Sequence, residues 1–249
     1  MKAIVELKNT TKVVTNGFNE ERVILDKVNL SIYQGDFITI LGGNGAGKST
    51  LFNVIAGTLP LTCGSVHILG EDVTNWPAEK RAKYLARVFQ DPKMGTAPRM
   101  TVAENLLIAK YRGEGRGLVP RKLSQQIEEF AQLLPRVGNG LEKHLETPAG
   151  LLSGGQRQAL SLLMASLKQP ELLLLDEHTA ALDPKTSQSL MQLTDELIAT
   201  KGMTALMVTH QMEDALRHGN RLIVMKNGQI IQDQTAEEKS KMKLEDYYK

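Results

Sequence analysis

A glycine-rich loop between an apolar strand and a helix constrains this chain more than any other feature. Residues 42–49 read Gly-Gly-Asn-Gly-Ala-Gly-Lys-Ser, which matches the phosphate-binding pattern G-x-x-x-x-G-K-[ST]. A buried strand is expected at Phe37–Leu41 and a helix from about Lys48 to Ala56. Glycines let the backbone turn tightly and direct successive N–H groups at phosphate oxygens. The sequence therefore predicts a nucleotide site at residues 42–49.

Each part of this loop has an expected role. The positive end of the helix should attract the phosphates, Lys48 should reach the β- and γ-phosphates, and the Ser49 hydroxyl should face Mg²⁺. The alternative is a glycine-rich turn with no chemical role, which the flanking strand and helix disfavour. The residues expected to contact ATP here are Gly42, Gly43, Asn44, Gly45, Ala46, Gly47, Lys48, Ser49 and Thr50.

A second apolar strand ends in two carboxylates. Residues 172–177 read Leu-Leu-Leu-Leu-Asp-Glu, as expected for a strand that is covered on both faces. Asp176 is predicted to hold Mg²⁺, and Glu177 to orient or deprotonate the attacking water. Buried strands often end in acidic residues, so this pattern gains its meaning from the loop upstream.

The pentapeptide Leu-Ser-Gly-Gly-Gln at 152–156 lies between these two motifs, and Gln156 stands 20 residues before Asp176. With this feature the chain resembles the ABC ATPases. The resemblance implies that Ser153, Gly154, Gly155 and Gln156 close over the γ-phosphate held by a second copy. It thus implies a head-to-tail pair with two ATP molecules between the subunits.

Three further residues fit the resemblance. Gln90 resembles the glutamine that contacts Mg²⁺ and water, Asp183 belongs to a segment that communicates across the dimer, and His210 resembles the switch histidine. Each has a plainer alternative, namely a surface polar residue or a structural histidine. The other histidines examined, His67, His144 and His218, are interpreted as structural. Catalysis is therefore assigned to Glu177, His210, Gln90 and Lys48, and magnesium binding to Ser49, Gln90 and Asp176.

Two positions depart from the family pattern. An aromatic residue that stacks on adenine commonly precedes the loop, but the corresponding position is Val14, and the nearest aromatic residue is Phe18. His178 stands where proline is common after the glutamate. The sequence gives no physical account of this histidine, and a tolerated variation is the plainer reading.

The order of elements predicts an α/β protein: a P-loop NTPase core with an antiparallel β subdomain and an inserted α-helical subdomain. We expect a single ABC ATPase domain over 1–249. The core and β subdomain are expected at 1–90 and 169–235, the helical subdomain with the pentapeptide at 91–168, and a tail at 236–249.

Composition and charge limit the class of binding partner and the cellular compartment that can be expected. Lys and Arg number 30 against 28 Asp and Glu, and this balance does not favour a nucleic-acid binder, which must neutralise several phosphates. The only cysteine, Cys63, is expected to be a small apolar residue in a reducing compartment. Apolar runs fall short of the roughly 20 residues of a membrane helix, and Glu6 interrupts any signal peptide. We expect a cytoplasmic protein that a partner recruits to the inner face of the cell membrane.

A membrane transporter is the function that this organisation favours. Roughly 100 residues without sustained heptads separate the loop from the pentapeptide, unlike the ABC ATPases of DNA repair and chromosome structure, and translation factors normally carry two cassettes. The stretches 42–57, 150–164 and 172–185 resemble bacterial importers that work with lipoprotein-type binding proteins, some assigned to tryptophan or tyrosine. An exporter or a soluble non-transport ATPase remains the alternative.

The expected partners are an integral membrane permease, a second copy of the chain and an extracytoplasmic substrate-binding lipoprotein. By resemblance, a coupling helix of the permease would fit a groove beside Gln90, lined by residues 91–101 and 147–150. The basic, glycine-rich segment 112–122 could face the membrane or partner, although a solvated loop is the plainer reading.

Overall fold

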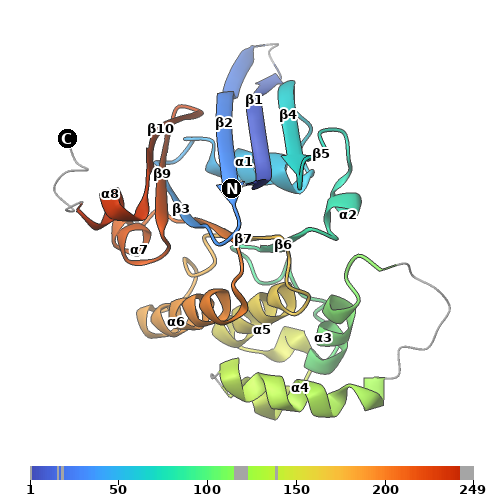
Figure 1. Cartoon of the computed structure of the whole chain (residues 1–249). Coiled ribbons are helices and arrows are strands. Elements are labelled where there is room, and N and C mark those ends of the chain that lie inside the picture. The colour runs from blue at the N-terminus through green and yellow to red at the C-terminus, as the bar shows by residue number, and fades with distance from the viewer. Residues whose placement is uncertain (1, 16, 18–19, 115–122, 138–139, 242–249) are drawn as a thin grey trace.

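The computed structural model describes residues 2–15, 17, 20–114, 123–137 and 140–241. Two β-sheets lie one above the other in Figure 1, and a group of helices lies below the larger sheet. The strands are β1 (Ala3–Thr15), β2 (Glu21–Tyr33), β3 (Phe37–Leu41), β4 (Cys63–Ile68), β5 (Glu71–Asp72), β6 (Leu85–Val88), β7 (Leu172–Asp176), β8 (Ala205–Val208), β9 (Arg221–Lys226) and β10 (Gln229–Gln234).

The larger sheet has the order β10-β9-β3-β8-β7-β6. Its strands β9, β3, β8, β7 and β6 run parallel, and β10 returns antiparallel to β9 across the turn at Asn227 and Gly228. Because β3, β8, β7 and β6 are consecutive neighbours, their carboxyl ends meet along one edge of the sheet. The segments that follow these four strands therefore lie close together.

The smaller sheet has the order β2-β1-β4-β5 and is antiparallel. The register between β1 and β2 shifts several times, for example between Leu7 and Thr10. Such bulges bend and twist a strand pair. The predicted combination of an α/β core with an antiparallel β unit is confirmed.

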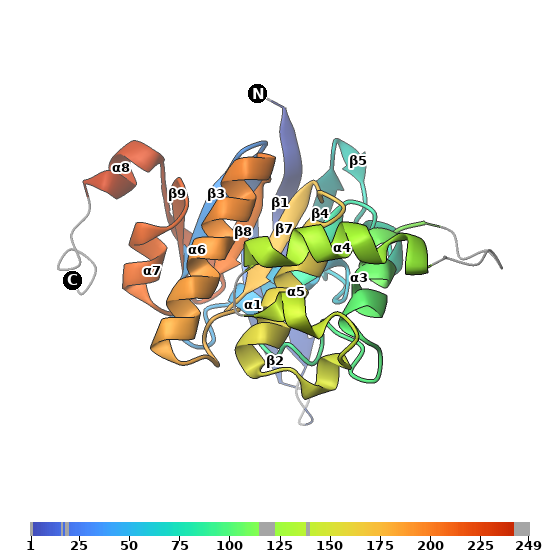
Figure 2. The same ribbon diagram turned by 90° about the horizontal axis from the view of Figure 1, so that it is seen from below.

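The helices divide between the two faces of the larger sheet. Helix α1 lies between the sheets, whereas α3, α4, α5 and α6 lie on the opposite face, as Figures 1 and 2 show. The α-helices are α1 (Lys48–Ala56), α2 (Ala78–Arg81), α3 (Val102–Lys110), α4 (Ile127–Leu133), α5 (Gly154–Ser166), α6 (Pro184–Lys201), α7 (Met212–Arg217) and α8 (Ala236–Ser240). Short 3₁₀ turns are η1 (Leu123–Gln125), η2 (Leu134–Val137), η3 (Leu141–His144) and η4 (Ala149–Leu151).

Strand β7 shows how one sheet serves two cores. Leu172 and Leu174 pack into the core between the sheets, while Leu173 and Leu175 pack into the core shared with α3, α5 and α6. Side chains of a strand alternate between its faces, so a strand that is buried on both faces must be apolar throughout. The four consecutive leucines meet this requirement and hold the following carboxylates at a fixed position.

The sequence predicts a helical stretch over about 77–85, because Pro77 suits a helix start, but α2 ends at Arg81. The Arg81 guanidinium is buried, and among its acceptors are the carbonyl oxygens of Val54 and Ile55, at 2.8 and 2.9 Å. This arginine ties α2 to the end of α1. The chain then turns so that Leu85 can pair with Leu172 at the start of β6.

The inserted helices α3, α4 and α5 fall between β6 and β7 in the chain. The boundaries of the helical subdomain, between residues 90 and 91 and between residues 168 and 169, remain predictions. In the tail, α8 occupies Ala236–Ser240, and residues 242–249 lie outside the described part, as does most of the segment 112–122. None of the helices in the described part combines the length and hydrophobicity of a membrane span.

Candidate functional site

The glycine-rich loop joins β3 to α1 in a conformation that depends on glycine. Gly45 and Gly47 have φ angles of +79° and +100°, a region that residues with a Cβ rarely adopt. A Cβ on Gly47 would also stand 2.8 Å from the carbonyl oxygen of Ile24. Among the described residues, no side chain caps the start of α1. The first N–H groups of this helix are thus left for a ligand, and an anion suits them.

Lys48 is buried beside this loop, with 7% of its surface exposed. Its Nζ donates to the carbonyl oxygens of Gly42 at 2.6 Å and Gly43 at 3.2 Å. An ammonium group has three donors, so one donor remains beyond these two bonds. The side chain is held at the loop, and the positive charge lies where the phosphates are expected.

The carboxylate of Asp176 lies at the end of β7 and pairs with an arginine that the sequence analysis missed. Arg87 of β6 reaches Asp176 Oδ2 at 2.5 Å and Asn53 Oδ1 of α1 at 2.7 Å. The two charged side chains are each 14% exposed. Arg87 therefore connects β6, β7 and the helix that follows the loop. A charged residue between the apolar Ala86 and Val88 of a strand was the sequence signal for it.

Glu177 and His210 come from neighbouring strands and face each other. Glu177 Oε2 lies 3.4 Å from His210 Nδ1, and the Glu177 N–H donates to the carbonyl oxygen of Val208 at 3.1 Å. Glu177 has a positive φ of 43°. The glutamate carboxylate is partly buried and the histidine is half exposed, so a water molecule or a ligand can approach the pair.

Gln90 lies two positions beyond β6 and is exposed at the same edge. The segment before it is fixed by the buried Gln158 of α5, whose Nε2 donates to the Phe89 carbonyl oxygen at 2.8 Å. Gln158 links the Gln90 segment to the helix that carries the pentapeptide. This link was also missed, because it joins positions that are far apart in the sequence.

The strand order of the larger sheet thus places the loop 42–49, Gln90, Asp176, Glu177 and His210 along one edge. The sequence named these residues but did not predict the order of the strands. For magnesium, the expected donors Ser49, Gln90 and Asp176 supply one hydroxyl, one amide and one carboxylate. No cluster of three His, Cys, Asp or Glu side chains in the described residues would hold a metal by itself. This donor set fits Mg²⁺, which prefers oxygen ligands and commonly relies on one or two carboxylates, water and substrate phosphates.

The pentapeptide begins α5 with a reciprocal cap. The Ser153 hydroxyl accepts from the Gln156 N–H at 3.2 Å, and Gln156 Oε1 accepts from the Ser153 N–H at 3.1 Å. The hydroxyl can still donate its own proton, because the cap uses only its acceptor capacity. A Cβ on Gly155 would overlap the Thr186 methyl group of α6. Glycine is therefore required where α5 approaches α6.

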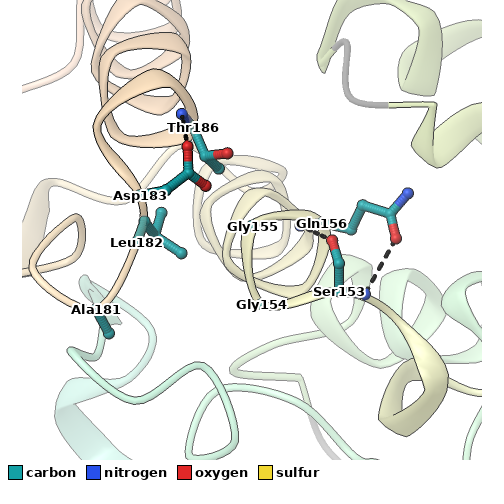
Figure 3. Close-up of a pocket in the computed structure, with 8 residues that line it drawn as sticks. All are labelled: Ser153, Gly154, Gly155, Gln156, Ala181, Leu182, Asp183 and Thr186. Carbon is teal, nitrogen blue, oxygen red and sulfur yellow. Dashed lines mark hydrogen bonds between the residues drawn. The ribbon is translucent and has the colours of Figure 1, made fainter.

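A pocket of about 340 Å³ opens over this helix start. Figure 3 shows Ser153 and Gln156 on one side, and Asp183 and Thr186 at the start of α6 on the other. Asp183 accepts from the Thr186 N–H at 3.1 Å, and hydrogen bonding from Thr186 lowers the pKa of the Asp183 carboxyl. The pocket is lined by Ser153, Gly154, Gly155, Gln156, Ala181, Leu182, Asp183 and Thr186.

The two departures from the family pattern have different outcomes. Val14 is partly exposed on β1, opposite Arg22 on β2, whose guanidinium lies 3.8 Å from where a Cβ on Gly45 would stand. Phe18 lies outside the described residues.

His178 is 1% exposed and its Nε2 lies 3.0 Å from Thr194 Oγ1. Burial lowers the pKa of His178 to about 4. The structure thus gives this histidine a partner that sequence reasoning missed.

Comparison with known proteins supports the interpretation. The family model described as "ABC transporter" matches residues 25–180. A tyrosine transport ATP-binding protein of Clostridioides difficile is 41% identical over 98% of this chain and 96% of its own length. The spermidine/putrescine import protein PotA of Haemophilus ducreyi is 38% identical over 95% of this chain, which spans 59% of PotA.

A solved structure agrees with the fold. The dimeric bacterial ABC transporter cassette MJ0796 has a TM-score of 0.78 and 29% identity, covering 93% of this chain and 98% of the other. The same cassette in a post-hydrolysis state with ADP and Pi has a TM-score of 0.73 and 32% identity over the same shares. The predicted P-loop NTPase fold is confirmed, and with it a site for ATP and Mg²⁺. The chain belongs to the ABC transporter family and is one of its ATP-binding, ATP-hydrolysing cassettes.

Proposed function

We propose that this chain is the ATPase subunit of an ABC importer for a small solute such as an amino acid. Its relatives include a cassette named for tyrosine transport and cassettes named for spermidine and putrescine import. Closure of two copies around ATP would drive the permease between its outward-facing and inward-facing states. The chain would work at the inner face of the cell membrane, held there by the permease.

The observation that carries the proposed closure of two copies around ATP is the separation of two incomplete half-sites on one chain. The first is the sheet edge with the loop 42–49. The second is the pocket of about 340 Å³, lined by residues 153–156 of the pentapeptide, by residues 181–183 and by Thr186 in the first turn of α6. Hydroxyl and N–H donors at a helix start suit an anion, yet the loop 42–49 contributes nothing to this lining. A second copy in head-to-tail orientation would supply the phosphates.

In the closed pair, each residue has a distinct task. The loop N–H groups and Lys48 bind the β- and γ-phosphates, while Ser153 and Gly155 of one copy face the γ-phosphate on the other. Glu177 orients the attacking water and accepts its proton. His210 contacts both the glutamate and the γ-phosphate and so fixes their relative positions. Ser49, Gln90 and Asp176 would hold Mg²⁺, which would offset phosphate charge when bound. Phosphoryl transfer depends mainly on such positioning and charge stabilisation.

A second cavity, of about 1200 Å³, offers a place for the permease. It lies between the α2 side of the core and the helices α3 and α5, and its wall includes the exposed Met94 and Ile108 together with Met164. Met94 and Gly95 belong to the stretch 91–101 that was expected to line the groove, whereas residues 147–150 are absent from the described lining. A short amphipathic helix of the permease would fit this groove.

The test is capture of partners from membranes. Tagged Glu177→Gln chain, with MgATP, is used to pull down partners from gently solubilised native membranes. A multi-span membrane protein together with an extracytoplasmic binding lipoprotein would support the importer. A membrane protein alone, with export of a solute, would overturn import in favour of an exporter. Ribosomal or DNA-repair partners alone would overturn transport. A matched capture with Met94→Glu, which places a charge in the groove, should lose the membrane protein.

A further inference from the structure

The backbone of Glu177 needs support from its surroundings. Its φ of 43° is uncommon for a residue with a Cβ, and such conformations persist only where the rest of the structure fixes them. One support comes from β8, because the Glu177 N–H donates to the Val208 carbonyl oxygen at 3.1 Å. Another is a tight turn, in which the Ala180 N–H donates to the Glu177 carbonyl oxygen at 3.0 Å. Both bonds involve only the backbone.

The next residue adds a side-chain support from α6. His178 is 1% exposed and lies between β7 and α6, with Nε2 3.0 Å from Thr194 Oγ1. The Thr194 hydroxyl donates its one proton to the Leu190 carbonyl oxygen at 2.8 Å. Its oxygen must therefore accept at the other contact, so His178 donates through Nε2. Both side chains are buried, and neither can exchange this bond for one to bulk water.

Helix α6 is also part of the other half-site. Its N-cap residue Asp183 lines the pentapeptide pocket, and its Thr186 methyl group packs where Gly155 leaves room. The same helix therefore carries one wall of the pocket and, about two turns further along, the acceptor for His178. A displacement of α6 would reach the backbone beside Glu177 through this hydrogen bond.

We propose that His178 is a positioning residue for ATP hydrolysis, which holds the Glu177 backbone in its left-handed conformation by donating to Thr194. The inference rests on the proposed role of Glu177. His178 itself is buried, with 1% of its surface exposed, so it acts through Glu177. The bond fixes the direction in which the Glu177 carboxylate leaves the sheet edge, and ATP binding at the loop does not involve it.

Three substitutions separate this role from plain stability. His178→Leu removes the donor at similar size, His178→Gln keeps an N–H donor at similar reach, and Thr194→Val removes the acceptor without changing shape. Thr200→Val is the matched control, because the Thr200 hydroxyl donates to the Glu196 carbonyl oxygen at 2.7 Å on the same helix. Misplacement of a catalytic group can lower the rate up to about 100-fold.

The measurement is steady-state ATPase activity of the purified full chain at concentrations that allow pairing, with the melting temperature recorded beside it. His178→Leu and Thr194→Val should lower kcat by roughly 10- to 100-fold, with KM for ATP within about twofold. The double variant should be no worse than either single one, since both remove the same bond. His178→Gln should recover most of kcat, and Thr200→Val should match the wild type.

Several results would overturn the inference. One is a folded Thr194→Val chain with wild-type kcat; another is a loss of kcat that Thr200→Val shares, or that His178→Gln fails to repair. If His178→Leu does not fold, Thr194→Val carries the test. The proposed role of Glu177 fails separately. An active Glu177→Gln chain would show that Glu177 is not the catalytic base. An inactive Glu177→Gln chain beside a fully active His178→Leu chain would refute only the positioning role of His178.

Discussion

The two halves of the nucleotide site are built in different ways on one chain. In the loop half the charged side chains are already paired: Lys48 is buried and bonded to its own loop, and Asp176 is paired with Arg87. The pentapeptide half is an open pocket whose polar groups are satisfied mainly by a helix cap. From this difference we propose that the loop half binds nucleotide without a partner, whereas the open half acts only when another copy brings phosphates.

The largest expected effect comes from Glu177 in the loop half. Glu177→Gln keeps the size of the side chain but removes the base, so the ATPase rate should fall by roughly 100- to 10,000-fold. Nucleotide binding should persist, and the ATP-bound pair should accumulate, which size-exclusion chromatography with MgATP would detect. A Glu177→Gln chain that stays monomeric at saturating ATP and hydrolyses at the normal rate would show that another group is the base.

Lys48→Ala should give the next largest effect, and it should act on binding by the isolated chain. Charge-assisted hydrogen bonds contribute about 1.5–3 kcal/mol each, so ATP affinity should fall by roughly 10- to 100-fold. Equilibrium binding of a fluorescent ATP analogue to dilute protein measures this. Unchanged affinity would mean that the loop half does not hold the phosphates through this lysine.

Substitutions of Ser153 test the open half, because this residue both caps α5 and is proposed to face the phosphates of the other copy. Ser153→Asp keeps a good helix cap but places a negative charge toward the phosphates. It should leave ATP binding by the dilute chain within about twofold while lowering hydrolysis and pairing at least about tenfold, the effect of one lost charge-assisted bond or more. Parallel binding and ATPase assays make the comparison. Weakened binding by the monomer would contradict the separation of the two halves.

A smaller effect should follow from loss of the cap itself. Ser153→Ala should destabilise the chain by about 1 kcal/mol, as should Thr235→Ala, because Thr235 caps α8 in the same reciprocal manner. Chemical denaturation measures both. Only the Ser153 variant should also lose pairing, so Thr235→Ala is the matched control; equal loss in both would reduce Ser153 to a structural cap.

The smallest effect concerns pH at the start of α6. Thr186 lowers the pKa of the exposed Asp183 carboxyl below its usual 3.8, so the folded state binds this proton less readily than the unfolded state. The stabilisation is present above about pH 4 and is lost as pH falls through the lowered pKa. Asp183→Asn keeps the cap, and its melting temperature should fall less between pH 5 and pH 3 than that of the wild type. Identical pH profiles would contradict this.

The sequence predicted correctly those features that depend on neighbouring residues, such as helix ends, turns and caps. Helix α1 begins at Lys48 and ends at Ala56 as predicted, because Gly47 and Gly57 bound it on both sides. The Asn-Gly pair at 227–228 likewise predicts a hairpin, and Thr101 with Glu104 predicts a capping box; both are present. The order of the strands, which places the functional residues along one edge of the larger sheet, was not predicted.

It failed where side chains meet across the fold. Arg87 with Asp176, Gln158 with Phe89 and His178 with Thr194 join segments on different elements, and no spacing rule reveals such pairs. The helix expected at 77–85 was too long because the contacts of Arg81 with α1 are also tertiary. These contacts organise the support around the site, and only a three-dimensional structure reveals them.

Complementation between two variants tests the head-to-tail site most directly. Glu177→Gln damages the loop half and Ser153→Asp damages the open half, so each protein alone should be nearly inactive. A mixed pair joins the intact loop half of one copy to the intact pentapeptide of the other. With random pairing in an equal mixture, half of the pairs would be mixed and each would have one intact site of two, which sets an upper limit of roughly a quarter of the wild-type rate for a two-fold symmetric dimer. Because Ser153→Asp weakens pairing and Glu177→Gln pairs are held together by unhydrolysed ATP, the account predicts a rate below this limit but clearly above that of either parent. A mixture that stays as inactive as its parents would contradict it.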